Sequence, residues 1–176
     1  MNLFTERLIL RNYEPTDYER VHYYGSQPNF SKYEEWGPNS EEDTEKFLAA
    51  KVKESESTPR FIFDLAVCLK DGNLQIGGCG IRRDGESSSV ANLGWAMNPD
   101  FQNLGYTTEA ARRLIEFGFN DLNVSVIYAT CDTRNGASYK VMEKLGMKRV
   151  GLVKDDRLVR GLSRDSYRYE ILKAGF

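Results

Sequence analysis

The sequence predicts a mixed α/β (α+β) fold in a single domain, with a central sheet of about seven strands flanked by about four helices. Three observations support this prediction. The chain has 176 residues, and one domain usually has roughly 100–200. Segments rich in β-forming residues alternate with segments of helical periodicity along the whole chain. No repeat, low-complexity tract or Pro/Gly/Ser-rich linker divides residues 1–176, so we expect one unit.

The N-terminal half predicts strands and helices in a recognisable order. Pro15 ends the first strand, and Ser40 with Asp43 three residues later predicts the start of a capped helix. Residues 70–73 contain Asp-Gly-Asn, which is typical of a hairpin turn. The elements expected here are a strand at 7–11, helices at 16–24 and 40–54 separated by a loop at 25–39, and strands at 61–69, 74–81 and 89–97.

The C-terminal half continues the pattern and contains the connection that sets the topology. Gly146 follows a helical segment as a suitable C-terminal cap. The elements expected here are helices at 108–119 and 137–145 and strands at 124–131, 147–154 and 166–172. The order predicts antiparallel pairing early in the chain and one parallel crossover around the helix at 108–119.

Charge and hydropathy exclude several classes of protein. Lys and Arg number 24 against 26 Asp and Glu, a net charge of −2, whereas nucleic-acid-binding domains are usually basic. The basic segment 157–168 contains or adjoins three aspartates, so nucleic acid is not the expected partner. No apolar run reaches about 18 residues, which excludes a membrane-spanning helix. Residues 1–7 do not resemble a signal peptide, so we expect a cytoplasmic protein.

The cysteines predict neither a metal site nor a nucleophile. Cys68, Cys79 and Cys131 are widely spaced, and His22 is the one histidine. Zinc sites need closely grouped Cys and His ligands, and a nucleophilic cysteine needs a histidine partner. We therefore expect three reduced core cysteines and no metal.

The segment 92–110 is the most informative part of the chain. It predicts the end of a strand, a turn with one glycine and the start of a helix. Free backbone N–H groups and the helix dipole then point at one place, which suits a pyrophosphate. The spacing matches neither a Walker loop nor a dinucleotide fingerprint. Taken alone, an ordinary strand–helix connection explains the pattern as well.

Motifs elsewhere in the chain accompany this turn in a fixed order. They are Thr5-Glu6-Arg7-Leu8-Ile9-Leu10-Arg11, Ile76-Gly77-Gly78, Gly94-Trp95, Gln102-x-x-Gly105-x-Thr107, Gly105-Tyr106-Thr107-Thr108-Glu109-Ala110, and the run from Asn135 to Met147. Together they resemble the GNAT N-acetyltransferases, whose R/Q-x-x-G-x-G/A turn binds the pyrophosphate of acetyl-CoA. The surrounding residues are most similar to the Rim-type branch, which acetylates the N-termini of ribosomal proteins.

The resemblance implies the GNAT fold and a set of acetyl-CoA-binding residues. Gln102 would open the turn, with a plain surface residue as the alternative. Asn135 would hydrogen-bond the cofactor or cap the helix after it, and these two roles are compatible. Ser138 would lie near the thioester sulfur or merely fill the first turn. The remaining implied contacts are main-chain groups: Met97 and Asn98 for the pantetheine arm, and the N–H groups of Asn103, Leu104, Gly105, Tyr106, Thr107 and Thr108 for the pyrophosphate.

Two departures from the family pattern affect catalysis and binding. Thr107 replaces the usual Gly or Ala. Its β-branched side chain crowds the close approach of the backbone to the cofactor, or its hydroxyl donates to a phosphate. Asn92 stands where many members of the branch have a glutamate as candidate general base, and asparagine cannot take a proton at neutral pH. The tyrosine acid of other family members falls on Met142. The nearby Tyr139 is turned about 60° around the helix from that place.

A missing base favours an acceptor that is already neutral. An α-amine has a pKa of about 7.7–8.0, whereas a lysine amine has a pKa of about 10.4. We therefore expect an α-amine to react better than a lysine. Glu35 in the early loop is a candidate replacement base, with a solvated loop carboxylate as the alternative.

The expected function is acetyl-CoA-dependent transfer of an acetyl group to a primary amine, without a metal. The expected acceptor is the α-amine of a protein or peptide N-terminus. One alternative is acetylation of a small amine such as a polyamine, an amino acid or an antibiotic. A second alternative is a non-catalytic acyl-CoA-binding module. A homodimer is compatible with the sequence, which does not determine the oligomeric state.

Overall fold

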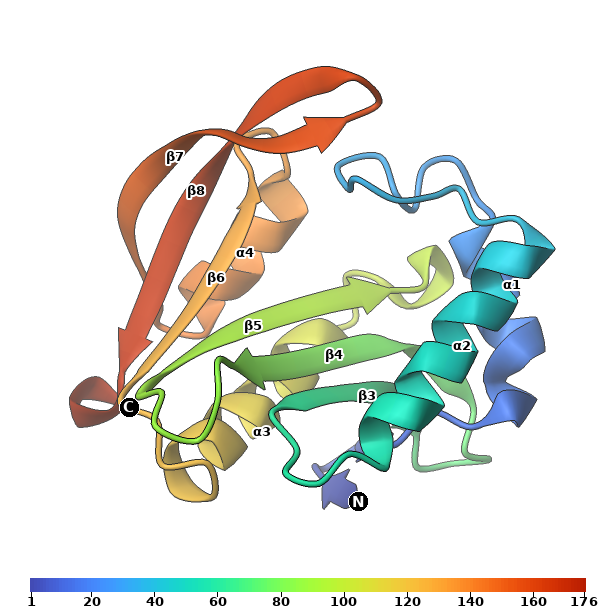
Figure 1. The fold of residues 1–176 in the computed structure, drawn as a ribbon, viewed down its shortest axis with the longest axis horizontal. Helices are drawn as coiled ribbons and strands as arrows, with labels where there is room; N and C mark the ends of the chain where they lie inside the picture. Colours follow the sequence, from blue (N-terminus) through green and yellow to red (C-terminus); the bar gives the residue numbers. More distant parts are fainter.

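The computed structural model describes residues 1–176 and confirms the predicted mixed α/β architecture (Figure 1). One eight-stranded sheet has the order β1-β2-β3-β4-β5-β6-β8-β7. Its strands are β1 Asn2–Phe4, β2 Leu8–Arg11, β3 Ile62–Leu69, β4 Gln75–Arg83, β5 Val90–Met97, β6 Val126–Asp132, β7 Lys148–Val159 and β8 Leu162–Leu172. The helices are α1 Tyr18–Gly25, α2 Glu41–Ser55, α3 Tyr106–Asn120 and α4 Gly136–Lys144. None of these helices combines the length and the apolar character needed to cross a bilayer.

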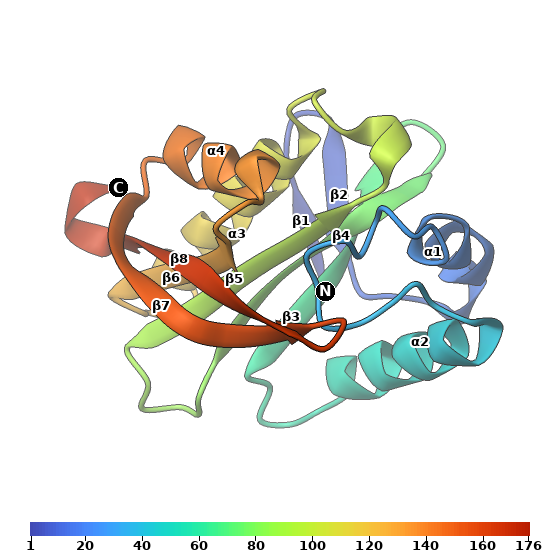
Figure 2. The same cartoon turned by 90° about the horizontal axis from the view of Figure 1, so that it is seen from above.

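The helices cover the two faces of the sheet in pairs. Helices α1 and α2 pack on one face, against β4 and β3, while α3 and α4 cover the other (Figure 2). The larger hydrophobic core lies between the sheet and α3, where Leu114, Ile115 and Phe119 are buried. A smaller core under α1 and α2 includes Tyr13, Tyr24 and Leu48. The predicted cap of α2 is present, because the Ser40 side chain accepts from Asp43 N–H and the Asp43 carboxylate accepts from Ser40 N–H.

Two parts of the sheet differ from the expected strands. The three-residue strand β1 pairs antiparallel with β2, and it is too short to show a periodic pattern. Strands β7 and β8 form one long hairpin that turns at Arg160-Gly161, both at positive φ. Register shifts interrupt the hairpin between Val153 and Arg157, which hides its period-2 alternation. Most side chains of β7 are exposed, so burial gives no pattern there either.

The predicted parallel crossover is present and leaves a gap in the sheet. Strands β5 and β6 pair in parallel over three residues each, Val90–Asn92 with Val126–Tyr128. Beyond Asn92, β5 continues to pair with β4, and β6 continues to pair with β8. The two strands therefore diverge from Asn92 onward, as Figure 1 shows between the green β5 and the orange β6.

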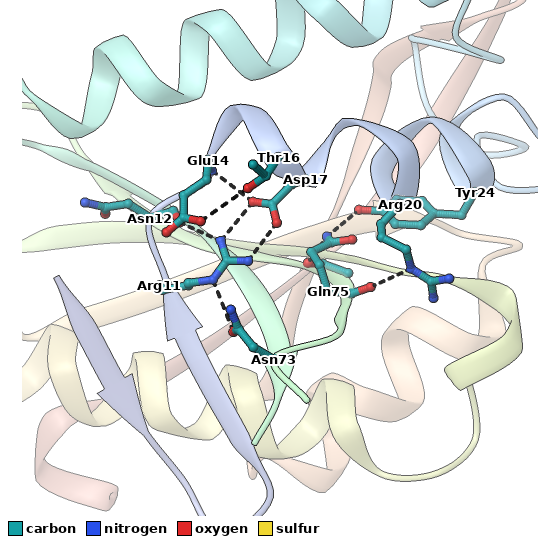
Figure 3. A network of polar contacts seen from close by, with 10 residues as sticks. Arg11, Asn12, Glu14, Thr16, Asp17, Arg20, Tyr24, Asn73 and Gln75 are labelled. Carbon is teal, nitrogen blue, oxygen red and sulfur yellow. Dashed lines mark hydrogen bonds and ion pairs between the residues drawn. The ribbon is translucent and has the colours of Figure 1, made fainter. Parts of the chain in front are cut away.

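A buried ion pair fixes the start of α1 against the sheet (Figure 3). Arg11 at the end of β2 donates two hydrogen bonds to the Asp17 carboxylate, at 2.8 and 2.7 Å. Gln75 on β4 donates to the hydroxyl of Tyr24 at 2.8 Å and so holds the other end of α1. The bond from Gln75 holds Tyr24 against β4, where its side chain lines the opening left by the divergence of β5 and β6.

Candidate active site

The divergence of β5 and β6 opens a cleft of about 940 Å³. Its residues come from both faces of the sheet. One half is lined by the turn before α3 and by α4, including Asn103, Thr107 and Ser138. The other half is lined by the early loop, α1, α2 and the β7–β8 hairpin, including Phe30, Trp36 and Arg157. Two chemically different halves meet at the gap between the strands.

The turn before α3 presents a row of unpartnered backbone N–H groups. Asn103 and Gly105 have positive φ, 61° and 84°, which turn the chain sharply into the helix. The Gln102 amide donates to Met97 O at 3.0 Å and ties the turn to the end of β5. The backbone N–H groups of residues 103–108 donate to no backbone carbonyl outside the regular elements. The first turn of a helix has no internal acceptor, so these six N–H groups can bind an anion.

The N-terminal segment braces this turn, and this is the part of the site that sequence reasoning missed. The Glu109 carboxylate in α3 accepts from Thr5 Oγ1 at 2.6 Å, from Arg7 N at 2.9 Å and from Arg7 Nε at 2.7 Å. Arg7 also donates to Leu104 O at 3.1 Å and lies 4.3 Å from the ring of Tyr106. Both motifs were visible in the sequence, but only the fold shows that they meet.

We expect Glu109→Gln to lower the free energy of unfolding by about 1–2 kcal/mol at pH 7, since it weakens charge-assisted hydrogen bonds at a partly exposed site. Burial opposes the charge of Glu109, but the bonds from Thr5 and Arg7 outweigh it and lower the carboxyl pKa. This stabilisation is therefore present above the unfolded-state pKa and is lost as the pH falls through the folded-state pKa. Denaturant unfolding of both proteins at pH 7 and pH 3 checks this. An equal difference at both pH values would contradict it.

The half of the cleft lined by the turn before α3 and by α4, here called the cofactor half, contains cations and no carboxylate. Lys140 and Lys144 line it beside Thr107 and Thr108, and neither lysine forms a salt bridge. At the other end of α4, Asn135 caps the helix by accepting from Ser138 N–H at 3.2 Å. This confirms the capping alternative for Asn135, and Asn135 also lines the cleft. Free N–H groups and unpaired lysines together suit a polyanionic ligand.

The backbone N–H groups of Met97 and Asn98 point in opposite directions. Asn98 N–H donates to Ile76 O in β4, and Asn98 O accepts from Phe101 N–H. Successive residues of a strand alternate, so Met97 N–H points away from β4 into the gap. Asn98 is fully buried with both main-chain groups already bonded. The structure therefore favours Met97 over Asn98 for the predicted main-chain contact with the pantetheine arm.

The apex of the cleft holds Asn92 and a buried charge cluster. Asn92 lies in register with Arg82 on β4 and Tyr128 on β6. Asp64 accepts two bonds from Arg82 at 2.9 Å and one from Lys51 at 2.6 Å. Burial favours protonation of Asp64, but the two cations outweigh it and lower its pKa. Asp64 is therefore a poor base, and Asn92 cannot act as one.

The early loop and the β7–β8 hairpin meet across the other half of the cleft, here called the acceptor half. Arg157 on β7 donates to Glu34 Oε2 at 3.0 Å, and Leu158 N–H donates to Glu35 Oε1 at 3.0 Å. Burial raises the pKa of Glu34, and Arg157 partly offsets this. The predicted stand-in base Glu35 thus lines the cleft with one oxygen already accepting a hydrogen bond. Its catalytic role stays a prediction, as does that of Ser138.

The three cysteines are buried and unpaired, as predicted. Cys131 lines the cleft beside Ser138, and burial raises its thiol pKa to about 11. Its thiol is therefore neutral at pH 7 and a weak nucleophile. No group of three or more His, Cys, Asp or Glu side chains gathers in a geometry suited to a metal ion.

Comparison with known proteins decides the family. A family model described as an acetyltransferase (GNAT) domain matches residues 7–148. The chain belongs to the GNAT acetyltransferases. It is 35% identical over 174 residues to the uncharacterised N-acetyltransferase YnaD of Bacillus subtilis, covering 98% of each chain. A crystal structure of a GNAT acetyltransferase from Bacillus anthracis matches with a TM-score of 0.86 and 34% identity over 99% of each chain.

Two more distant GNAT structures share the fold with this acetyltransferase but differ in acceptor. One is RimL, a ribosomal L7/L12 α-N-protein acetyltransferase in complex with coenzyme A, with a TM-score of 0.85, 15% identity and 98% of each chain covered. The other is spermidine N-acetyltransferase from Vibrio cholerae in complex with CoA and spermine, with a TM-score of 0.81 and 19% identity, covering 97% of this chain and 98% of that one. The GNAT fold therefore serves both protein and small-molecule amines.

Proposed function

We propose that this GNAT enzyme transfers the acetyl group of acetyl-CoA to the α-amine of a peptide or protein N-terminus. The observation that supports it most is the row of six free N–H groups at residues 103–108, placed at the mouth of the gap between β5 and β6. A pyrophosphate bound there directs a pantetheine arm along Met97 toward the centre of the sheet. Lys140 and Lys144 add positive charge beside the same turn.

Each part of the cleft then has a chemical role. The neutral amine attacks the thioester carbonyl of acetyl-CoA. The C–N bond forms as the C–S bond breaks, and the proton that the amine loses goes to the departing thiolate or to water. Met97 N–H points into the gap and donates to the carbonyl oxygen as negative charge develops on it. Ser138 lies at the first turn of α4 within the same cleft and positions or protonates the departing sulfur. A thiolate with a pKa of about 8.5, by analogy with cysteine, needs little help from an acid.

The absence of a strong base at the apex favours an α-amine. Asn92 is neutral, Asp64 is paired with two cations, and Glu34 is paired with Arg157. The acceptor must therefore arrive largely unprotonated. At pH 7 about a tenth or more of an α-amine is neutral, against less than about 0.1% of a lysine amine.

We expect a peptide that contains both amines to be acetylated at its N-terminus at least about tenfold faster than at lysine. Fragmentation of the product by mass spectrometry locates the acetyl group. The kcat/KM should rise between about pH 6.5 and pH 8 and then level off, since the acceptor amine titrates in this range. A preference for the lysine side chain would refute the proposal.

The alternative of a small amine as acceptor uses the same cleft and the same turn. It would be preferred if 2-phenylethylamine or an amino acid amide reacted while every peptide failed. The same assay therefore compares these amines with peptides at equal concentration and pH.

A further inference from the structure

Most carboxylates of the acceptor half already form ion pairs within the protein. Four line it: Glu34, Glu35, Asp64 and Asp156. Arg157 Nη1 lies 3.0 Å from Glu34, and its Nε lies 3.5 Å from Asp156. The side chains of Arg157, Glu34 and Asp156 are 19%, 33% and 27% exposed, so these pairs are only partly shielded from water. This corner of the cleft is therefore not a free acidic surface.

The opposite corner is compensated in the same way. Asp64 is 7% exposed and bonds both Arg82 and Lys51. Glu35 is the one carboxylate of the four without a cationic partner, and it accepts a hydrogen bond from Leu158 N–H. Lys51 also pairs with Glu54 at 2.9 Å, so none of the three cations is free. Three of the four lining carboxylates are therefore already held in ion pairs within the protein. Glu35 is thus the one carboxylate left to accept a hydrogen bond from the reacting amine, which arrives neutral.

A second ammonium group on the acceptor would be unfavourable in this cleft. It would leave water without gaining a free carboxylate, and burying an unpaired charge is costly. It would also approach Arg157, Arg82 or Lys51, and like charges at short range disfavour the charged form. The acceptor half is therefore selective against polycations.

Aromatic side chains also line the acceptor half. The rings of Tyr24 and Phe30 lie 4.8 Å apart, and those of Phe30 and Trp36 lie 5.6 Å apart. Trp36 is 43% exposed and lines the cleft, so part of its face is available to a ligand. Tyr13 and Phe47 form a second edge-on pair at 5.4 Å on the same side. Such a wall binds an apolar or aromatic group by burying it.

From the paired charges and the aromatic wall, we infer that the acceptor has one amine next to an uncharged, apolar or aromatic group, and is not a polyamine or a lysine-rich N-terminus. For peptides, the first side chain lies against Phe30 and Trp36. This inference rests on the proposed transfer to an α-amine and narrows its substrate class.

Tetrapeptide amides that differ only in the first residue test the inference. With Phe, Leu, Lys or Glu followed by three alanines, the α-amine pKa values are similar, so kcat/KM reports the side chain. We expect Phe and Leu to exceed Lys at least about tenfold, which corresponds to about 1.4 kcal/mol. We also expect spermidine to react more slowly than 2-phenylethylamine.

Variants that release a carboxylate sharpen the test. Arg157→Gln frees Glu34 and Asp156, and Arg82→Gln leaves Asp64 with Lys51 alone. Arg82 is 49% exposed, so its replacement is the milder change to the fold. In both variants we expect the ratio of Phe to Lys peptide activity to fall by at least about threefold, and a ratio does not depend on the folded fraction. Trp36→Ala should reduce the activity with Phe peptide more than with Lys peptide.

Three outcomes would each overturn one or both of these claims. Equal or faster reaction of spermidine or the Lys peptide would refute the acceptor class and leave acetyl transfer intact. Reaction of 2-phenylethylamine without any peptide would refute the N-terminal acceptor and support the acceptor class. Failure of every acceptor, despite binding of acetyl-CoA, would refute both.

Discussion

Thr107→Glu abolishes stabilisation by acetyl-CoA and leaves the melting temperature of the unliganded protein unchanged or slightly raised. Thr107 is the second residue of α3, where a carboxylate is favourable to the helix dipole. The same carboxylate faces the N–H groups of residues 103–108 and repels a pyrophosphate. Acetyl-CoA at about 100 times its dissociation constant should stabilise the wild type by roughly 2.7 kcal/mol. Thermal unfolding with and without acetyl-CoA measures both effects.

Thr107→Gln is the matched control, because it has the same size as Thr107→Glu without the charge. We expect it to keep most of the stabilisation by acetyl-CoA. Thr107→Ala restores a residue type that the family commonly has here. Its affinity for acetyl-CoA shows whether the Thr107 side chain strengthens or weakens the binding of acetyl-CoA. An unchanged shift in Thr107→Glu would mean that the phosphates bind elsewhere.

Gly94→Leu is expected to lower kcat/KM for the acceptor by at least about 100-fold, because it fills the acceptor half of the cleft. Gly94 lies on β5 in register with Gly80, and a Cβ built on it meets no atom within 4 Å. The added side chain therefore enters open space in the cleft rather than the core. A displacement of about 1 Å in a reacting group can already cost 10²-fold.

The same substitution should leave the binding of acetyl-CoA and the folded state intact. Its melting temperature and its shift with acetyl-CoA serve as the internal controls. Gly94→Ala, which adds only a methyl group, should retain most of the activity. Loss of acetyl-CoA binding in Gly94→Leu would contradict the division of the cleft into two halves.

The sequence was sufficient where local chemistry decides the structure. The cap formed by Ser40 and Asp43, the hairpin turn at residues 70–73 and the parallel crossover around α3 all follow from short patterns. The turn at residues 103–108 also follows from its motif, since the free N–H groups of a helix start are a local property. These features needed no knowledge of distant contacts.

The rest depends on residues that are far apart in the chain. The brace joins Arg7 to Glu109 across 102 positions, and Arg157 meets Glu34 across 123. No spacing rule predicts such pairs from one sequence. The sequence predicted Glu35 as a replacement base or a solvated loop carboxylate, whereas the β7–β8 hairpin supplies a hydrogen-bond partner for both Glu34 and Glu35. The hairpin itself was predicted too short because its register shifts break the alternation.

The most direct test is the rate of CoA thiol release from acetyl-CoA with and without an Ala-first or Phe-first peptide, measured on the wild type, Thr107→Glu and Gly94→Leu. We predict acceptor-dependent release by the wild type, with the acetyl group on the peptide α-amine. In both variants this acceptor-dependent rate should be at least about 100-fold lower than in the wild type. A wild type that releases no thiol beyond the rate without acceptor, or variants that match the wild type, would contradict transfer at this cleft.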